Sequence, residues 1–222
     1  VLKKYKIDAE IIVSDSSTDR SPEIAREFNV KLVKHDKEGY GNAYIEAFKH
    51  VKGKYIFMAD ADGSYDFSYI PVFLESLKEG YDFVIGNRFA NKMDKGIMPW
   101  SHKHIGNPLL SGILRLFYGT TIKDSHCGMR AIRTESLRSL NLRTTGMEFA
   151  SEMVIKVLKK NLKIKQIPIN YNKRIGKSKL NTFADCWRHL RFMLLYSPLF
   201  LFFYPGLILF IFGIISIILW LI

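Results

Sequence analysis

Residues 55–85 read YIFMADADGSYDFSYIPVFLESLKEGYDFVI, and this stretch decides the fold class. An apolar run over Tyr55–Ala59 predicts a strand, the spacing of Ile70–Glu79 predicts a helix, and Phe83–Ile85 predicts a second strand. Parallel strands need a crossover connection, commonly a helix, whereas antiparallel strands can be joined by a tight turn. The stretch therefore predicts an α/β domain in which helices cover a parallel sheet.

The same alternation continues on both sides of this stretch. Upstream, Glu10–Ser14 and Val30–Val33 read as strands and Gly41–Val51 as a helix. Ser21–Glu23 reads as a helix start, because Pro22 fits the first helical position. Downstream, helices are expected over Asn107–Phe117 and Glu148–Lys160, and an edge strand carrying Pro168 is expected over Ile164–Tyr171.

The C-terminal part of the chain has the composition of a membrane segment. No Lys, Arg, Asp or Glu follows Arg191. A helix over Leu199–Ile222, rising about 1.5 Å per residue, is long enough to cross a hydrocarbon core of about 30 Å. If Pro205 and Gly206 form a turn, only the part from Leu207 onward spans. A buried core helix is the other alternative.

The stretch before this segment is basic and amphipathic. Phe183–Leu195 carries Trp187 on an apolar helical face and Arg188 and Arg191 elsewhere, which predicts a helix lying in a membrane interface. By the positive-inside rule, these basic residues place the preceding domain on the cytoplasmic face. We therefore expect an α/β domain over residues 1–181, an interfacial helix over 182–198 and a transmembrane segment over 199–222.

The charge balance narrows the classes of partner. The chain has 33 Lys and Arg against 21 Asp and Glu, a net charge of +12, which suits nucleic acid, anionic lipid or phosphorylated substrates. No recognition-helix, zinc-finger or aromatic RNA-binding pattern is present, so no nucleic-acid partner is expected. Cys127 and Cys186 lack the spacing of a metal site or a disulfide framework, which favours a reducing compartment.

Acidic side chains follow two of the predicted strands. Asp15 and Asp19 follow the strand that ends at Ser14, and Asp60 and Asp62 follow Tyr55–Ala59. In open α/β sheets, ligands bind at the carboxyl ends of the strands. Two carboxylates at i and i+2 supply the hard oxygen ligands that Mg²⁺ or Mn²⁺ prefers. Asp60 and Asp62, supported by Ser64, are therefore predicted to hold a divalent metal that neutralises a diphosphate, although such a pair also occurs in solvated turns.

Two glycines open the helix predicted over Gly41–Val51. Gly39 and Gly41, in EGYGNAY, permit close backbone approach and expose amide groups at a helix N-terminus. An ordinary turn with two glycines is the alternative.

Six motifs in order carry a resemblance to a known family. They are IIVSDSSTD (11–19), EGYGNA (38–43), MADADGSYD (58–66), VIGNRF (84–89), DSHCGMRA (124–131) and NKRIGKSK (172–179). In order and spacing, the chain up to about Leu195 resembles the family 2 inverting glycosyltransferases of the dolichyl-phosphate mannose or glucose synthase type.

The resemblance implies a fold, a donor site and an acceptor site. The fold would be of the GT-A type, a Rossmann-like parallel or mixed sheet flanked by helices. Asp15 would contact the nucleoside, Asp60 and Asp62 would manage metal and diphosphate, and Arg88 would support donor or acceptor phosphates. Arg174, with Ser178 and Lys179, matches the position associated with the lipid phosphate, and Arg130 matches another phosphate-facing position. Substrate binding is further assigned to Asp19, Gly39, Gly41 and Asn42, to Asp124, which would shape the site, and to Glu152, which would orient an arginine or a sugar hydroxyl.

The chain departs from the family pattern at two places. The family begins with a strand that ends in a proline and acidic turn and helps to hold the nucleotide; this chain starts at Val1, lacks that element and is expected to be a fragment. Mannose synthases of this type often carry a glutamine where this chain has Ser64, so the metal shell is expected to differ.

The implied reaction is inverting transfer of a hexose from UDP-glucose or GDP-mannose to a polyprenyl or dolichyl phosphate. The acceptor is a phosphate monoester with a second pKa of about 6, so no strong general base is needed. Arg130, Arg174 and Lys179 would hold the attacking oxygen in line with the anomeric carbon. Two alternatives stay open, a processive polysaccharide synthase, for which a Gln-x-x-Arg-Trp run is missing, and a catalytically silent nucleotide-sugar-binding scaffold. His102, His104 and His126 suggest a second metal site or, more simply, polar loops.

Overall fold

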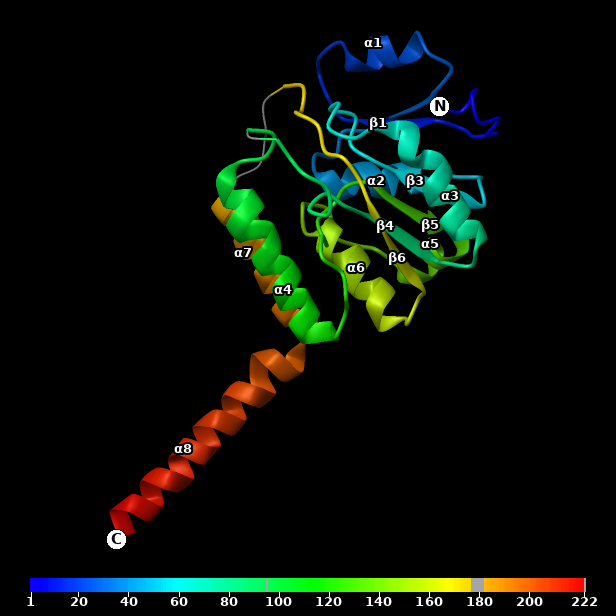
Figure 1. Cartoon of the computed structure of the whole chain (residues 1–222). Coiled ribbons are helices and arrows are strands. Elements are labelled where there is room, and N and C mark those ends of the chain that lie inside the picture. The colour runs from blue at the N-terminus through cyan, green and yellow to red at the C-terminus, as the bar shows by residue number, and fades with distance from the viewer. Residues whose placement is uncertain (95, 177–181, 222) are drawn as a thin grey trace.

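The computed structural model describes residues 1–94, 96–176 and 182–221. Figure 1 shows an α/β domain from which one long helix, α8, points away. The strands are β1 (Ile12–Asp15), β2 (Lys31–Lys34), β3 (Tyr55–Met58), β4 (Phe83–Asn87), β5 (Arg130–Arg133) and β6 (Ile164–Pro168). The helices are α1 (Ser21–Arg26), α2 (Tyr40–Phe48), α3 (Ile70–Lys78), α4 (Asn107–Tyr118), α5 (Thr134–Leu140), α6 (Phe149–Lys159), α7 (Thr182–Leu195) and α8 (Tyr204–Leu221).

The strands form two sheets. β1 and β2 pair in parallel, and the second sheet has the order β3-β5-β4-β6. β4 and β6 are parallel, whereas β5 runs antiparallel to both β3 and β4. The prediction of strands alternating with helices is confirmed, and β6 is the edge strand that Pro168 indicated. Of the parallel or mixed sheet that the resemblance implied, the mixed form is confirmed, because β5 runs through the middle of the sheet in the direction opposite to its neighbours.

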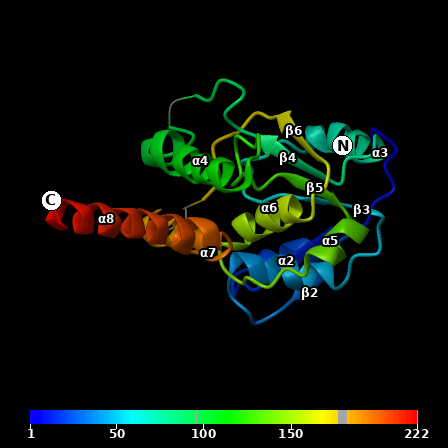
Figure 2. The same ribbon diagram turned by 90° about the horizontal axis from the view of Figure 1, so that it is seen from below.

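Amphipathic helices pack on the four-stranded sheet and complete the hydrophobic core. α3 packs across β3, β4 and β5, and Figure 2 shows it on one side of this sheet with α2, α5 and α6 on the other. All five residues of β4 are buried, Phe83 among them, and Phe73 and Phe149 are also fully buried. Burying a side chain of this size stabilises the fold by about 1.5–3 kcal/mol. This core fixes the ends of β3 and β4, from which Asp60 and Arg88 project.

The C-terminal helices continue from the domain without a tight turn. A π-helical turn, η3 (Leu199–Phe203), leads directly into α8, and Pro205 lies in the first turn of that helix, where a missing N–H costs nothing. The alternative of a turn at Pro205 and Gly206 is therefore wrong. Leu199–Leu221 forms a 23-residue helical stretch of mean hydropathy 2.5 with no share buried against the described residues, so the core-helix alternative gains no support from them.

α7 lies side by side with α4 (Figure 1) and also contacts α6. His189 and Met193 are buried against the domain, while Trp187, Arg188 and Arg191 are exposed. α7 therefore has the two-faced character expected of it, but its inner face packs on the α/β domain.

Candidate active site

Asp60 stands at the carboxyl end of β3 in partly buried surroundings. Burial, together with the neighbouring charge of Asp62, raises the pKa of the Asp60 carboxyl. A Cβ atom added to Gly128 would lie 2.8 Å from Asp60 Oδ2, so only glycine leaves room for the carboxylate here. A carboxylate pressed against a like charge in this way favours binding of a cation.

Asp62 is held from both sides. Its Oδ2 accepts a hydrogen bond from Arg174 Nε at 2.8 Å and a second from the same guanidinium, and its Oδ1 accepts from the backbone N and the hydroxyl of Ser64. Burial raises the pKa of Asp62, but the bonds from Ser64 and Arg174 lower it to below its usual value overall. Ser64 is fully buried, and its hydroxyl orients the carboxylate.

The segment that carries Arg174 lies along the segment that carries Asp62. Asn172 N donates to Ser64 O at 2.9 Å, Ile175 N donates to Asp62 O at 2.7 Å, and Tyr65 and Tyr171 form an isolated antiparallel bridge. The structure thus brings together the MADADGSYD and NKRIGKSK motifs, as the resemblance implied. Ser178 and Lys179, which belong to the second motif, lie outside the described residues.

The donor atoms at Asp60 and Asp62 fit a hard divalent cation. Mg²⁺ is commonly held by one or two carboxylates and completes its octahedron with water and substrate phosphates. Within residues 1–94, 96–176 and 182–221, no group of three or more His, Cys, Asp or Glu is placed to hold a metal by protein ligands alone. A metal at this site would therefore complete its shell with water and phosphate oxygens. His126 lies with His189, so the three-histidine alternative gains no support.

Arg88 and Arg130 do not face an open site. Arg88 donates to Asp124 from Nε at 2.7 Å, from Nη2 at 2.8 Å and from its backbone N at 3.1 Å, and both side chains are buried. Arg130 is 1% exposed and donates to the carbonyls of Cys127, Ala150 and Ser125. The phosphate-facing position expected for Arg130 is therefore wrong, since its guanidinium holds backbone in place. Arg88 and Asp124 shape the wall of the site.

Glu152 has a structural role that differs from the expected one. It is fully buried and accepts hydrogen bonds from the backbone N of Arg143 and Thr144, from the Thr144 hydroxyl and from Lys156. Burial raises the pKa of Glu152, but Lys156 and Thr144 lower it overall. The expectation that Glu152 orients an arginine side chain or a sugar is not met, because the carboxylate holds the loop before α6.

This loop meets the glycines at the start of α2. Gly41 N donates to Gly146 O at 3.2 Å and Asn42 N donates to Thr145 O at 3.1 Å. A Cβ added to Gly41 would lie 2.1 Å from Thr144 O. The close backbone approach predicted for the glycines is present, but the approaching group is the protein's own loop. The amides of Gly41 and Asn42 therefore already have partners within the protein, and the Asn42 side chain donates to Glu38 O at 2.7 Å.

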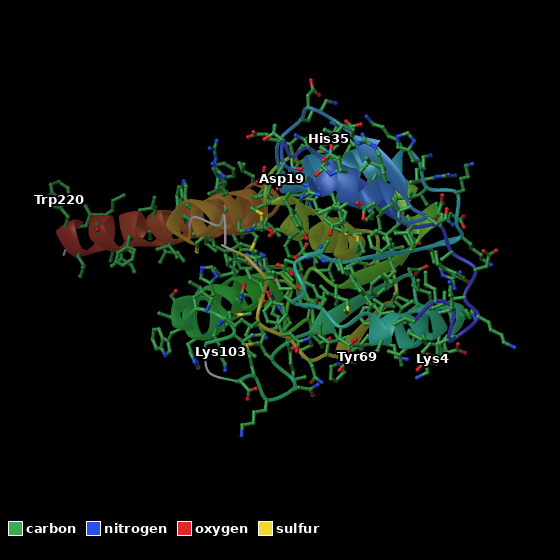
Figure 3. All side chains as sticks on the ribbon, turned by 90° about the horizontal axis from the view of Figure 1, so that it is seen from above. Lys4, Asp19, His35, Tyr69, Lys103 and Trp220 are labelled. Carbon is green, nitrogen blue, oxygen red and sulfur yellow. The ribbon has the colours of Figure 1, made fainter. Side chains whose placement is uncertain are left out.

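Asp15 and Asp19 lie on the smaller sheet. Asp15 pairs with Lys34 Nζ at 3.1 Å, and Asp19 accepts from the Ser17 hydroxyl and Ser21 N at 2.9 Å each. Burial raises the pKa of Asp15, but Ser17 and Lys34 lower it overall. Figure 3 shows Asp19 on the same side of the domain as His35 and across from Tyr69. Asp15 is the last residue of β1 and Asp19 follows it in the next turn, and the contact of Asp15 with a nucleoside stays a prediction.

Two tyrosines that the sequence reasoning did not single out lie beside Asp60. The Tyr44 hydroxyl donates to Asp60 Oδ1 at 3.4 Å, and its ring stacks on Phe149 with centroids 5.4 Å apart. Tyr40 packs edge-on against Tyr44 at 5.1 Å. Burial raises the pKa of both tyrosines, which keeps the hydroxyls protonated as donors. The available signal was their i, i+4 spacing, which puts both on one face of α2.

Comparison with known proteins identifies the family of the chain. The model of the family described as Glycosyl transferase family 2 matches residues 1–140. The chain is 43% identical over 219 residues to the low-salt glycan biosynthesis hexosyltransferase Agl6 of Haloferax volcanii, covering 98% of this chain and 53% of that protein. It therefore spans about half the length of that relative. It is 32% identical over 176 residues to the dolichyl-phosphate hexose transferase of the same organism, covering 79% of this chain and 75% of that protein.

A solved structure supports the fold assignment. The glucosyl-3-phosphoglycerate synthase of Mycobacterium tuberculosis, in complex with Mn²⁺, UDP and glucosyl-3-phosphoglycerate, superposes with a TM-score of 0.67 at 18% identity. The superposition covers 85% of this chain and 69% of that chain. At this identity the likeness concerns the fold alone. The chain has the GT-A fold and belongs to glycosyl transferase family 2.

Proposed function

We propose that this chain catalyses transfer of a hexose from a nucleotide-diphosphate sugar, UDP-glucose or GDP-mannose, to a polyprenyl or dolichyl phosphate, with inversion and with Mg²⁺ or Mn²⁺. The observation that carries the proposal is the ion pair between Asp62 and Arg174. It joins the acidic motif expected on the donor side to the basic motif expected on the acceptor side. A relative named a dolichyl-phosphate hexose transferase supports the acceptor class.

Asp60 and Asp62 would hold the metal, with the buried Ser64 hydroxyl fixing the orientation of Asp62. When bound, the metal would neutralise the charge of the departing nucleoside diphosphate. The Tyr44 hydroxyl donates a hydrogen bond to the Asp60 carboxylate and limits its rotation. The protein's own contribution on this side is thus two oriented carboxylates at the end of a rigid strand.

Arg174 would bind the acceptor phosphate. Its guanidinium presents a planar fork that matches a carboxylate or a phosphate, so the geometry that binds Asp62 also suits a phosphate monoester. The acceptor is largely dianionic above its second pKa of about 6, and its oxygen attacks without a base. A bond forms from that oxygen to the anomeric carbon while the bond to the diphosphate breaks, which inverts the anomeric centre. Charge placement and alignment do the catalytic work.

The membrane arrangement follows from α7 and α8. We propose that α8 crosses the bilayer and that the exposed face of α7, with Trp187, Arg188 and Arg191, lies at the interface on the cytoplasmic side. The neighbouring η2–α4 surface (η2 is His102–Gly106) adds exposed apolar side chains at Trp100, Ile105, Leu109 and Leu116. A polyprenyl phosphate headgroup would arrive at this level of the membrane.

The test is transfer of radiolabelled sugar by the full-length protein in membranes, with a panel of UDP- and GDP-sugars. We expect labelled lipid phosphate from wild type and none from Asp62→Asn. Asp66→Asn is the matched control, because Asp66 lies in the same segment but caps η1 (Phe67–Tyr69) through Ser68, and asparagine keeps that cap. Donor binding without labelled lipid would overturn the proposal and favour a sugar-binding scaffold.

A further inference from the structure

His126, Ser151 and His189 form a hydrogen-bonded cluster, and none of the three is a proposed ligand of the metal. Ser151 Oγ lies 3.1 Å from His126 Nε2 and 2.8 Å from His189 Nδ1, and these two nitrogens lie 3.3 Å apart. The imidazole rings meet edge to face, with centroids 4.5 Å apart. Ser151 is fully buried and His189 is 5% exposed. The three residues come from the segment between α4 and β5, from α6 and from α7, so the cluster joins three parts of the chain.

The cluster continues into α4. His126 Nδ1 lies 2.9 Å from Ser125 Oγ, which in turn lies 3.0 Å from Ser111 Oγ on α4. Both ring nitrogens of His126 therefore have serine partners. Buried networks in which the polar atoms are satisfied fix one geometry, because an alternative packing leaves polar groups without partners.

The segment that carries His126 also forms a wall of the site. Asp124 holds Arg88, and Gly128 lies against Asp60, whose Oδ2 leaves no room for a side chain there. On the other side, α7 leads through Ser197, whose hydroxyl donates to Tyr118 at 2.7 Å, to the apolar stretch ending in α8. Residues 124–130 thus touch Asp60 at one point and the helix that precedes α8 at another.

We propose that His126 and His189 are positioning residues, which lock α7 to the wall of the active site and so set the height of that site above the membrane for a lipid-borne phosphate. This inference rests on the proposed function. A headgroup anchored in a bilayer occupies a narrow range of heights, so its effective concentration at Arg174 depends on how firmly the domain is held relative to α7. A water-soluble acceptor phosphate approaches from any direction, so its binding does not depend on how firmly the domain is held relative to α7.

The kinetic test uses the full-length protein in liposomes with two acceptors, a bilayer-embedded polyprenyl phosphate and a water-soluble short-chain isoprenyl phosphate. We expect His189→Ala to raise the KM for the embedded acceptor about fivefold, the size of losing one buried hydrogen bond. The KM for the soluble acceptor and the kcat stay near wild type. His189→Asn restores the embedded-acceptor KM, because its amide supplies a polar atom near the place of Nδ1.

Met193→Ala is the matched control. Met193 is fully buried on the same helix, and its loss loosens apolar packing while leaving the histidine contact in place. If this variant separates the two acceptors as His189→Ala does, or if His189→Ala weakens both acceptors equally, the effect is general packing and the proposal is overturned.

A second readout does not depend on activity. Amide hydrogen exchange of the full-length protein in nanodiscs is expected to be faster in residues 124–130 in His189→Ala, and unchanged there in Met193→Ala and His189→Asn. Unchanged exchange in His189→Ala would overturn the proposed link between α7 and the site. If wild type transfers no sugar to either acceptor, the proposed function fails, whereas the exchange result still decides whether the histidines join α7 to the wall of the site.

Discussion

Arg174 Nε lies 2.8 Å from Oδ2 of Asp62, although 112 residues separate the two in the sequence. The contact forms because the backbone of residues 172–175 is tied to residues 62–64 by two hydrogen bonds. Asp62 is thereby a carboxylate with one oxygen turned to Ser64 and the other turned to a cationic side chain. The expected donor and acceptor halves of the site meet at this pair.

Arg174→Lys is expected to impair use of the acceptor more than use of the donor. Lysine keeps the charge but loses the planar fork. Losing a charged hydrogen bond of this kind lowers kcat/KM for the lipid phosphate by about ten- to a hundredfold. Steady-state kinetics with each substrate varied in turn measures the effect. Lys173→Ala, an exposed neighbour, is the control, and an equal loss with Lys173→Ala would contradict a specific role for Arg174.

Divalent metal is expected to stabilise the protein through Asp60 and Asp62. Burial and the charge of Asp62 raise the pKa of the Asp60 carboxyl, so a bound cation is expected to relieve this repulsion. A ligand that binds only the folded state raises the unfolding temperature. Thermal unfolding in detergent with a nucleoside diphosphate, with and without Mn²⁺, measures the shift. Asp60→Asn is expected to abolish it and Asp66→Asn to retain it. A shift of wild-type size in Asp60→Asn would place the metal elsewhere.

Glu152→Gln is expected to destabilise the fold by about 1–3 kcal/mol at neutral pH, because a buried carboxylate with several donors loses its charge. The folded-state pKa of Glu152 is lowered from its reference value of 4.5. Its stabilising contribution is therefore present above pH 4.5 and is lost as the pH falls through the folded-state pKa. Unfolding curves should show the difference in unfolding free energy between wild type and Glu152→Gln becoming smaller as the pH falls below 4.5. A difference that grows on acidification would contradict a stabilising role for the Glu152 carboxylate.

Gly41→Ala is expected to destabilise the protein by about 1–3 kcal/mol, because the new methyl group collides with the carbonyl of Thr144. Gly112→Ala provides the comparison. Gly112 lies inside α4, and its Cβ would meet only the end of the Arg115 side chain at 3.7 Å, so alanine there gains up to about 1 kcal/mol in helix propensity. Unfolding temperatures of the two variants should therefore move in opposite directions from wild type.

The helices of the core could be predicted because their apolar spacing is local information. The predicted starts and ends of α3, α4 and α6 fall within a residue of the observed ones. β5 could not be predicted in this way, since its four residues, Arg-Ala-Ile-Arg, begin and end with charge. Arg130 is buried there with its guanidinium donating to the carbonyls of Cys127, Ser125 and Ala150, and no sequence pattern shows that these carbonyls surround it.

The candidate site also contains residues that the sequence identifies and residues whose roles depend on tertiary contacts. Asp60, Asp62 and Arg174 stand out by residue type and by position after a strand or within a basic motif. The partners of Arg88 and Glu152 are Asp124 and the loop at Arg143, and these tertiary contacts are not evident from the sequence, in which the resemblance assigned both residues to substrates. The histidine cluster was hidden for the same reason, because His126 and His189 are 63 residues apart.

The most direct test of the account is the identity of the product made by the full-length protein in liposomes containing dolichyl phosphate, with Mg²⁺ or Mn²⁺ and a nucleotide sugar. Mass spectrometry and the anomeric coupling constant of the purified lipid give the number of sugars and the stereochemistry. The account predicts a lipid phosphate that carries a single hexose with the anomeric configuration inverted from the donor. A lipid or polymer carrying several hexoses, a retained configuration, or no sugar-bearing lipid would contradict it.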